Sequence, residues 1–118
     1  MLQGRSIFVV EDEIMVLINI EDILKDHGCT RITSAATVEQ ALEILETLSF
    51  DAAVLDVNLD GKMSHSVADE LSARRIPFVV STGYWEDALD GRYRNQPVLR
   101  KPYRDDALLN ALAQLLGR

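Results

Sequence analysis

The sequence predicts an α/β fold, in which a doubly wound, five-stranded parallel sheet carries helices on both faces. Four short apolar runs, the last of them weaker, are each too short for a helix and are flanked by polar or turn residues, as buried strands are, and Arg31–Ala35 makes a fifth predicted strand. Segments with helical spacing of apolar residues lie between these runs. Regular alternation of strand and helix implies parallel strands joined by right-handed crossovers.

Each element has its own local signal. The predicted strands are Ile7–Val10, Arg31–Ala35, Ala52–Leu55, Phe78–Val80 and Val98–Leu99. Apolar stripes predict the helices, and their members are Ile14, Leu17, Ile18 and Leu24, then Val38, Ala41, Leu42, Leu45 and Leu48, then residues in Val67–Ala73 and in Leu108–Leu116. Thr37 and Gln40 have the spacing of a capping box at the start of the second helix.

Composition limits both the size and the partners of the protein. A chain of 118 residues with three prolines and six glycines suits one compact domain, residues 1–118. Its net charge of −7 argues against a nucleic-acid surface and against binding to anionic membranes. The start of the chain lacks signal-peptide features, and no apolar run approaches membrane-spanning length, so we expect a cytoplasmic protein.

Charged and hydroxyl side chains follow four of the predicted strands. Glu11 and Asp12 follow the first strand, Asp56 the third, Thr82 the fourth and Lys101 the fifth. In doubly wound sheets the carboxyl ends of the strands form one rim, where ligands bind. Each close pair of carboxylates there repels by roughly 4 kcal/mol at an effective dielectric constant of about 20. Lys101 offsets one of three negative charges, and oxygen ligands with an acidic surplus indicate Mg²⁺ or Mn²⁺.

A carboxylate beside such a metal can also act as a nucleophile toward phosphorus. Asp56 is the candidate acceptor, Lys101 would neutralise a transferred oxygen, and Thr82 would donate a hydrogen bond. Glu13 lies one position beyond the acidic pair, and we expect it to face solvent or the helix dipole rather than to join the site. The chemistry predicted for this rim is formation of an aspartyl phosphate.

These residues, in this order, resemble the receiver domain of bacterial two-component response regulators over essentially the whole chain. The acidic pair matches Glu11 and Asp12, the phosphoacceptor matches Asp56 in "AVLDVNL", the hydroxyl residue matches Thr82, and "RKP" contains the matching Lys101. The resemblance implies a flavodoxin-like fold with strand order 2-1-3-4-5. It also implies a Mg²⁺ ion bound in part by the backbone carbonyl of Asn58. A histidine kinase or a phosphotransfer protein would donate the phosphoryl group.

The chain departs from the pattern of the family at several positions. Val98 stands where the family usually has the aromatic residue of its switch, Asp60 stands where it often has proline, and Ser64 is near a usual glycine. We therefore expect the loop after Asp56 to differ in shape.

The segment between Thr82 and Lys101 departs furthest from the family. Gly91 cuts its apolar stripe to about two turns, so we expect the fourth helix of the family to be short or mobile here. The stretch "VSTGY" is similar to a subgroup with a Phe-Ala-Thr-Gly-type motif, whose members are often stand-alone and associated with histidine kinases of the HWE type. Our hypothesis is that this segment switches between order and disorder on phosphorylation.

Three functions are compatible with the sequence. The first is a receiver without an output domain, which signals by binding a downstream target protein or serves as a phosphate shuttle or sink. The second is a small Mg²⁺-dependent phosphatase with an aspartyl-phosphate intermediate, although that chemistry usually has a second acid where this chain has Asn58. The third is a degenerate receiver that acts only as an interaction module. The sequence leaves the oligomeric state open.

Overall fold

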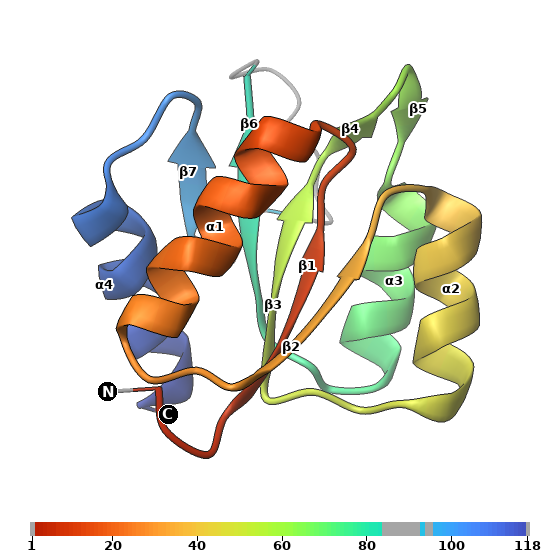
Figure 1. Ribbon diagram of the computed structural model, residues 1–118. Helices are drawn as coiled ribbons and strands as arrows, with labels where there is room; N and C mark the ends of the chain where they lie inside the picture. The colour runs from red at the N-terminus through yellow and green to blue at the C-terminus, as the bar shows by residue number, and fades with distance from the viewer. Residues whose placement is uncertain (1, 84–92, 94–95, 118) are drawn as a thin grey trace.

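The computed structural model describes residues 2–83, 93 and 96–117, and its centre is a five-stranded parallel sheet (Figure 1). The strands are β1 (Ser6–Val10), β2 (Arg31–Ala35), β3 (Ala52–Asp56), β6 (Phe78–Thr82) and β7 (Val98–Arg100). Their spatial order is β2-β1-β3-β6-β7. The predicted α/β class and the order 2-1-3-4-5 of the main strands are both confirmed.

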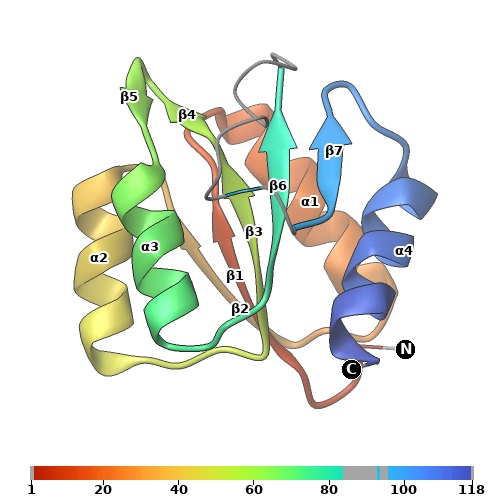
Figure 2. The ribbon, with the colours of Figure 1, turned by 180° about the vertical axis from the view of Figure 1, so that it is seen from behind.

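Helices cover both faces of the sheet. The described part of the chain has four helices, which are α1 (Ile14–Asp26), α2 (Val38–Thr47), α3 (His65–Ala73) and α4 (Asp105–Leu116). In two opposite views, α1 and α4 lie on one face, and α2 and α3 lie on the other (Figures 1 and 2). The segment predicted to hold a short or mobile helix, with its switch, falls on residues 84–92, 94 and 95, outside the described residues.

Two apolar clusters hold the sheet between its helix layers. Successive residues of a strand point to opposite faces, so Phe8 and Val10 pack with α2 and α3, while Ile7 and Val9 pack with α1 and α4. Burial on both faces explains why the strands read as continuous apolar runs. No helix in the described part of the chain is long and apolar enough to cross a bilayer.

The sequence predicted the positions of the helices better than it predicted which face of each helix is buried. Thr37 caps α2 as expected, and its Oγ1 accepts the Gln40 N–H at 3.1 Å. In α1, however, Ile14 and Ile18 of the predicted stripe are 66% and 46% exposed. The helix buries Leu24 of that stripe, together with Ile20 and Ile23, which the stripe did not include.

A small hairpin follows β3 and extends beyond the carboxyl ends of the sheet (Figure 1). Its strands are β4 (Asn58–Leu59) and β5 (Lys62–Met63), which pair antiparallel. Asp60 and Gly61 form the turn with φ of 52° and 86°. An Asp-Gly pair with both φ values positive is typical of a tight two-residue turn. The loop after Asp56 is therefore this hairpin, which forms one wall of the site.

Candidate functional site

The predicted site residues lie together at the carboxyl ends of the strands. An open cleft of about 800 Å³ is lined there by Asp12, Asp56, Asn58, Thr82 and Lys101, among others. Glu11 lies beneath this surface and is 1% exposed. Segments far apart in the chain thus contribute to one concave surface.

Glu11, Asp12 and Asp56 form an acidic triad. One ligand oxygen from each carboxylate lies within 4.8 Å of the other two. Glu11 and Asp56 are buried, whereas Asp12 is half-buried and lines the cleft. A set of carboxylate oxygens with one lysine beside it fits a hard divalent cation and does not fit a site built from sulfur or nitrogen ligands.

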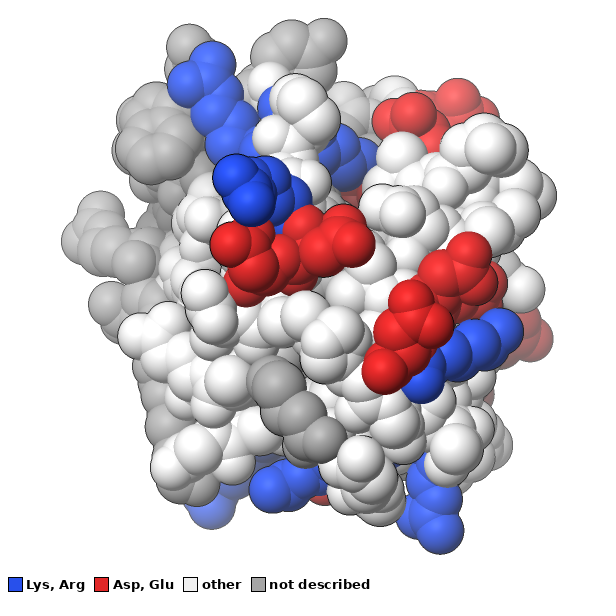
Figure 3. Space-filling view, turned by 60° about the vertical axis from the view of Figure 1, so that its left-hand side comes forward, with Lys and Arg blue, Asp and Glu red and all other residues white. Residues whose placement is uncertain are grey.

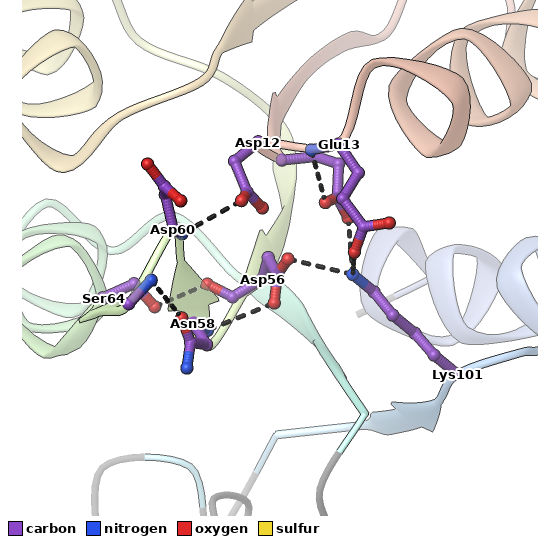
Figure 4. Close-up of polar contacts among 9 residues, drawn as sticks. Asp12, Glu13, Asp56, Asn58, Asp60, Ser64 and Lys101 are labelled. Atoms are coloured by element: carbon purple, nitrogen blue, oxygen red, sulfur yellow. Dashed lines mark hydrogen bonds and ion pairs between the residues drawn. The ribbon is translucent and has the colours of Figure 1, made fainter.

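Lys101 is the cation that balances part of this negative charge. Its Nζ lies 2.9 Å from Glu11 Oε1 and 2.9 Å from Asp56 Oδ2, and only the contact with Asp56 has hydrogen-bond geometry (Figure 4). The backbone N–H of Lys101 donates to the carbonyl oxygen of Thr82 at 2.7 Å, which fixes the start of the lysine segment against β6. One ammonium group therefore bridges two of the three acids.

Burial and the neighbouring charges both shift the pKa values of these groups. Burial raises the pKa of Glu11 to about 7; Lys101 opposes this rise, and the charge of Asp56 adds to it. Burial also raises the pKa of Asp56, again against the influence of Lys101. For Lys101, burial lowers the pKa, but the two carboxylates outweigh it and the net shift is upward. The metal-free site therefore holds its lysine charged and its buried acids reluctant to ionise.

Backbone and hydroxyl groups hold Asp56 in position. Its Oδ1 accepts the Asn58 N–H at 3.2 Å, and its carbonyl oxygen accepts the Ser64 hydroxyl at 2.6 Å. Ser64 is fully buried at the start of α3. Sequence reasoning noted Ser64 only as a departure from the family, and its proximity to Asp56 depends on the hairpin, which returns the chain to the end of β3.

The hairpin also holds Asp12. The backbone N–H of Asp60 donates to Asp12 Oδ2 at 3.0 Å, and the Asp60 side chain lines the cleft (Figure 4). The Asp-Gly pair at positions 60 and 61 signals a turn, but nothing in the sequence connects that turn to Asp12.

Thr82 and Glu13 also line the cleft, but they differ in burial. Thr82 ends β6, is 1% exposed and lines the cleft. Glu13, which we expected to lie outside the site, has a largely exposed side chain but also lines the cleft, with Oε1 at 3.9 Å from Lys101 Nζ. Its backbone N–H donates to Glu11 Oε2 at 3.1 Å, so Glu13 supports the buried acid from the main chain.

Comparison with known proteins agrees with this geometry. Residues 7–113 match the model of the response regulator receiver domain. The chain is 25% identical over 118 residues to the transcriptional regulatory protein PdtaR of Mycobacterium tuberculosis, covering 97% of this chain and 58% of that protein. It is 28% identical over 93 residues to the transcriptional regulatory protein YvrH of Bacillus subtilis, covering 76% of this chain and 39% of that protein. The chain therefore spans only part of the length of these curated relatives.

Solved structures match over nearly the whole chain. SdrG from Sphingomonas melonis Fr1 is 44% identical with a TM-score of 0.83, covering 95% of this chain and 96% of that one. The BeF3-activated conformation of SdrG is 43% identical with a TM-score of 0.80, covering 98% and 99%. The receiver domain of the sensor histidine kinase PA1611 from Pseudomonas aeruginosa PAO1 is 29% identical with a TM-score of 0.81, covering 98% and 99%, and holds a magnesium ion in its active site cleft.

Proposed function

Because the chain belongs to the response regulator receiver domain family, we propose that it is a signalling phosphoacceptor. Its Asp56 would take a phosphoryl group from a histidine kinase or a phosphotransfer protein. One observation carries this proposal: the Asp56 carboxylate lies at an open cleft, 2.9 Å from the Lys101 ammonium and within 4.8 Å of two further acids. A carboxylate needed only for stability would not be placed against two others.

The acids of this cleft suit Mg²⁺, with Mn²⁺ as a substitute. Glu11, Asp12 and Asp56 would hold the ion together with the backbone carbonyl of Asn58, and the magnesium-bound PA1611 receiver supports this assignment. When bound, the ion neutralises charge on the carboxylate and on the transferred oxygens. The ligands available in this site are carboxylate oxygens, and Mg²⁺ prefers oxygen ligands.

The residues of the cleft divide the transfer step between them. A carboxylate oxygen of Asp56 attacks the phosphorus of a phosphohistidine, so that an O–P bond forms and the P–N bond breaks. The bonding electron pair goes to the imidazole nitrogen, which is then protonated. Lys101 neutralises an oxygen of the transferred group as a point charge, and the Thr82 hydroxyl donates a hydrogen bond to another. The protein thus contributes position and charge.

An exposed apolar surface beside the cleft fits the donor protein. Ile14, Met15 and Ile18 in the first turns of α1 are 66%, 77% and 46% exposed, and Met15 also lines the cleft. Seen from the side of α4, acidic side chains gather in separate places with uncharged surface between them (Figure 3). A helical partner that lays apolar side chains on α1 would bring its phosphohistidine to Asp56. The "VSTGY" motif favours a kinase of the HWE type.

Incubation with acetyl phosphate and Mg²⁺, followed by intact mass measurement, tests the proposal. A persistent adduct that is lost in Asp56→Asn is expected. Asp60→Asn is the matched control, because it removes a carboxylate from the same cleft but keeps the backbone N–H that binds Asp12. Turnover of acetyl phosphate without an adduct would instead indicate a phosphatase, and no modification would indicate a degenerate module.

The docking surface is tested with a purified kinase. Met15→Ser should slow phosphoryl transfer from the kinase and leave modification by acetyl phosphate unchanged. Leu48→Ser is the control, because Leu48 is also exposed, at 48%, but lies at the far end of α2. Equal transfer rates in Met15→Ser and the parent protein would contradict the assignment of α1.

A further inference from the structure

Ser64 joins the end of β3 to the start of α3. Its hydroxyl donates to the carbonyl oxygen of Asp56 at 2.6 Å (Figure 4), and its backbone N–H donates to the carbonyl oxygen of Val57 at 2.8 Å. Its own carbonyl oxygen accepts the Ala68 N–H at 3.0 Å in the first turn of α3. Ser64 is 0% exposed, so water does not compete for these hydrogen bonds.

The hydroxyl of Ser64 is not used as a helix cap. Ser64 occupies the N-cap position of α3, where a serine side chain usually accepts a backbone N–H of the first turn. Its side chain makes no such bond, and the hydroxyl donates to the end of β3 instead. Because N-cap bonds stabilise helices, this arrangement favours the geometry of the Asp56 segment over the stability of α3.

The backbone that Ser64 holds carries two of the proposed cation ligands. These are the carboxylate of Asp56 and the carbonyl oxygen of Asn58, and the Asn58 N–H donates to Asp56 Oδ1 at 3.2 Å. The hairpin between Asn58 and Ser64 also supplies the Asp60 N–H, which donates to Asp12 Oδ2 at 3.0 Å. The hydrogen bonds that Ser64 donates therefore close the base of this hairpin and fix the relative positions of three ligands.

Fixed ligands favour a cation with strict geometric demands. Mg²⁺ requires near-ideal octahedral coordination with oxygens at about 2.1 Å, whereas Ca²⁺ accepts about six to eight oxygens at roughly 2.3–2.6 Å in flexible arrangements. Both ions prefer carboxylate and carbonyl oxygens, so the types of ligand do not separate them. The rigidity of the ligands can separate them, because a segment that is free to move adapts more easily to the larger ion.

We propose that Ser64 is a positioning residue of the cation site, whose hydroxyl holds the backbone between Asp56 and Asn58 and so makes the cleft prefer Mg²⁺ to Ca²⁺. This inference rests on the proposed function, because it requires a cation bound at Asp56 and Asn58. Ser64 acts through these ligands and does not bind the ion itself. Removing a group that orients metal ligands in this way commonly lowers metal affinity by about 10- to 100-fold.

Cation titrations of Ser64→Ala test the inference. Isothermal titration calorimetry with Mg²⁺ and, separately, with Ca²⁺ gives both dissociation constants. We expect Ser64→Ala to bind Mg²⁺ about tenfold more weakly than the parent and to bind Ca²⁺ within about twofold of the parent. Ser64→Gly lacks the same hydroxyl and should behave like Ser64→Ala.

Ser34→Ala is the matched control for these variants. It also removes one hydroxyl donor, from a hydrogen bond to Glu21 Oε2 of 2.9 Å, and neither residue of that pair lines the cleft. We expect Ser34→Ala to bind both ions like the parent. Circular dichroism at the temperature of the titrations checks that each variant is folded.

Three results would overturn the inference. Unchanged Mg²⁺ affinity in the two Ser64 variants would show that the hydroxyl does not position the ligands. Equal weakening of Mg²⁺ and Ca²⁺ binding would show that it does not set the preference between the ions. The same loss in Ser34→Ala would show a general effect of stability. A parent protein that binds no Mg²⁺ would be a different result, because it would contradict the proposed function itself.

Discussion

Raising the pH from about 5 to about 8 should destabilise the metal-free protein, mainly through Glu11. The pKa of Glu11 is raised to about 7 in the folded protein, because the carboxyl group is buried. In an unfolded chain a glutamate has a pKa of about 4.3. Between these values the folded protein keeps a proton that the unfolded chain releases. Stability contributed by protonated Glu11 is therefore fully present below about pH 4.3 and is lost as the pH rises through about 7.

The magnitude follows from the two pKa values. Each pKa unit corresponds to about 1.4 kcal/mol, so the full shift of the Glu11 pKa corresponds to about 4 kcal/mol, of which roughly 3 kcal/mol is lost between pH 5 and pH 8. The effect is not strongly screened by solvent, because Glu11 is 1% exposed. The raised pKa of Asp56 acts in the same direction. Glu39, whose pKa is lowered by Lys62, contributes stability that is lost only on the acid side of this range.

Urea unfolding with a chelator present, at several pH values across this range, measures the effect. We expect the free energy of unfolding to fall with pH in the parent and to change much less in Glu11→Gln. Both proteins contain the same two histidines, so the difference between them reports on Glu11 and on its interaction with Asp56. With Mg²⁺ present the apparent metal affinity should rise over the same pH range, because the ion needs the carboxylate. A flat or rising stability in the parent, or the same slope in Glu11→Gln, would refute the reasoning.

Other predictions concern the same site and one helix cap. Mg²⁺ should raise the melting temperature, because it binds the folded acidic triad; no shift at millimolar Mg²⁺ would count against the metal site. Asp56→Asn should stabilise the metal-free form by removing one of the crowded charges, and calorimetry showing a lower melting temperature would contradict this. Lys101→Met should destabilise that form, since Glu11 and Asp56 lose their shared cation. Thr37→Ala should cost about 1 kcal/mol in urea unfolding, the value of an N-cap hydrogen bond, and no loss would mean that the Gln40 contact is dispensable.

The sequence itself determined the fold class and the residues at the ends of the strands. Strands buried on both faces are continuous apolar runs, and the helices between them have their own spacing, so both signals are local. In a parallel sheet every carboxyl end lies on the same edge. Knowing that Glu11, Asp56 and Lys101 follow strands was therefore enough to expect them near one another.

The spacing of apolar residues indicated the buried side of α2 but only part of the buried side of α1. The apolar residues of α1 extend around more of the helix than the sheet covers. Ile14 and Ile18 satisfied the helical spacing but are exposed, because the sheet and α4 leave the first turns of α1 uncovered. The hydrogen bonds from Ser64 to Asp56 and from Asp60 to Asp12 were equally inaccessible, since they depend on where the hairpin folds back.

The tertiary structure alone decided which acid is buried and what surrounds it. Glu11 and Asp12 are neighbours in the chain, yet Glu11 is enclosed beneath the cleft while Asp12 lines it. The free energy of ionising a carboxyl group depends on the water it loses and on charges brought near it by distant segments. For Glu11 those segments are the end of β3 and the lysine after β7.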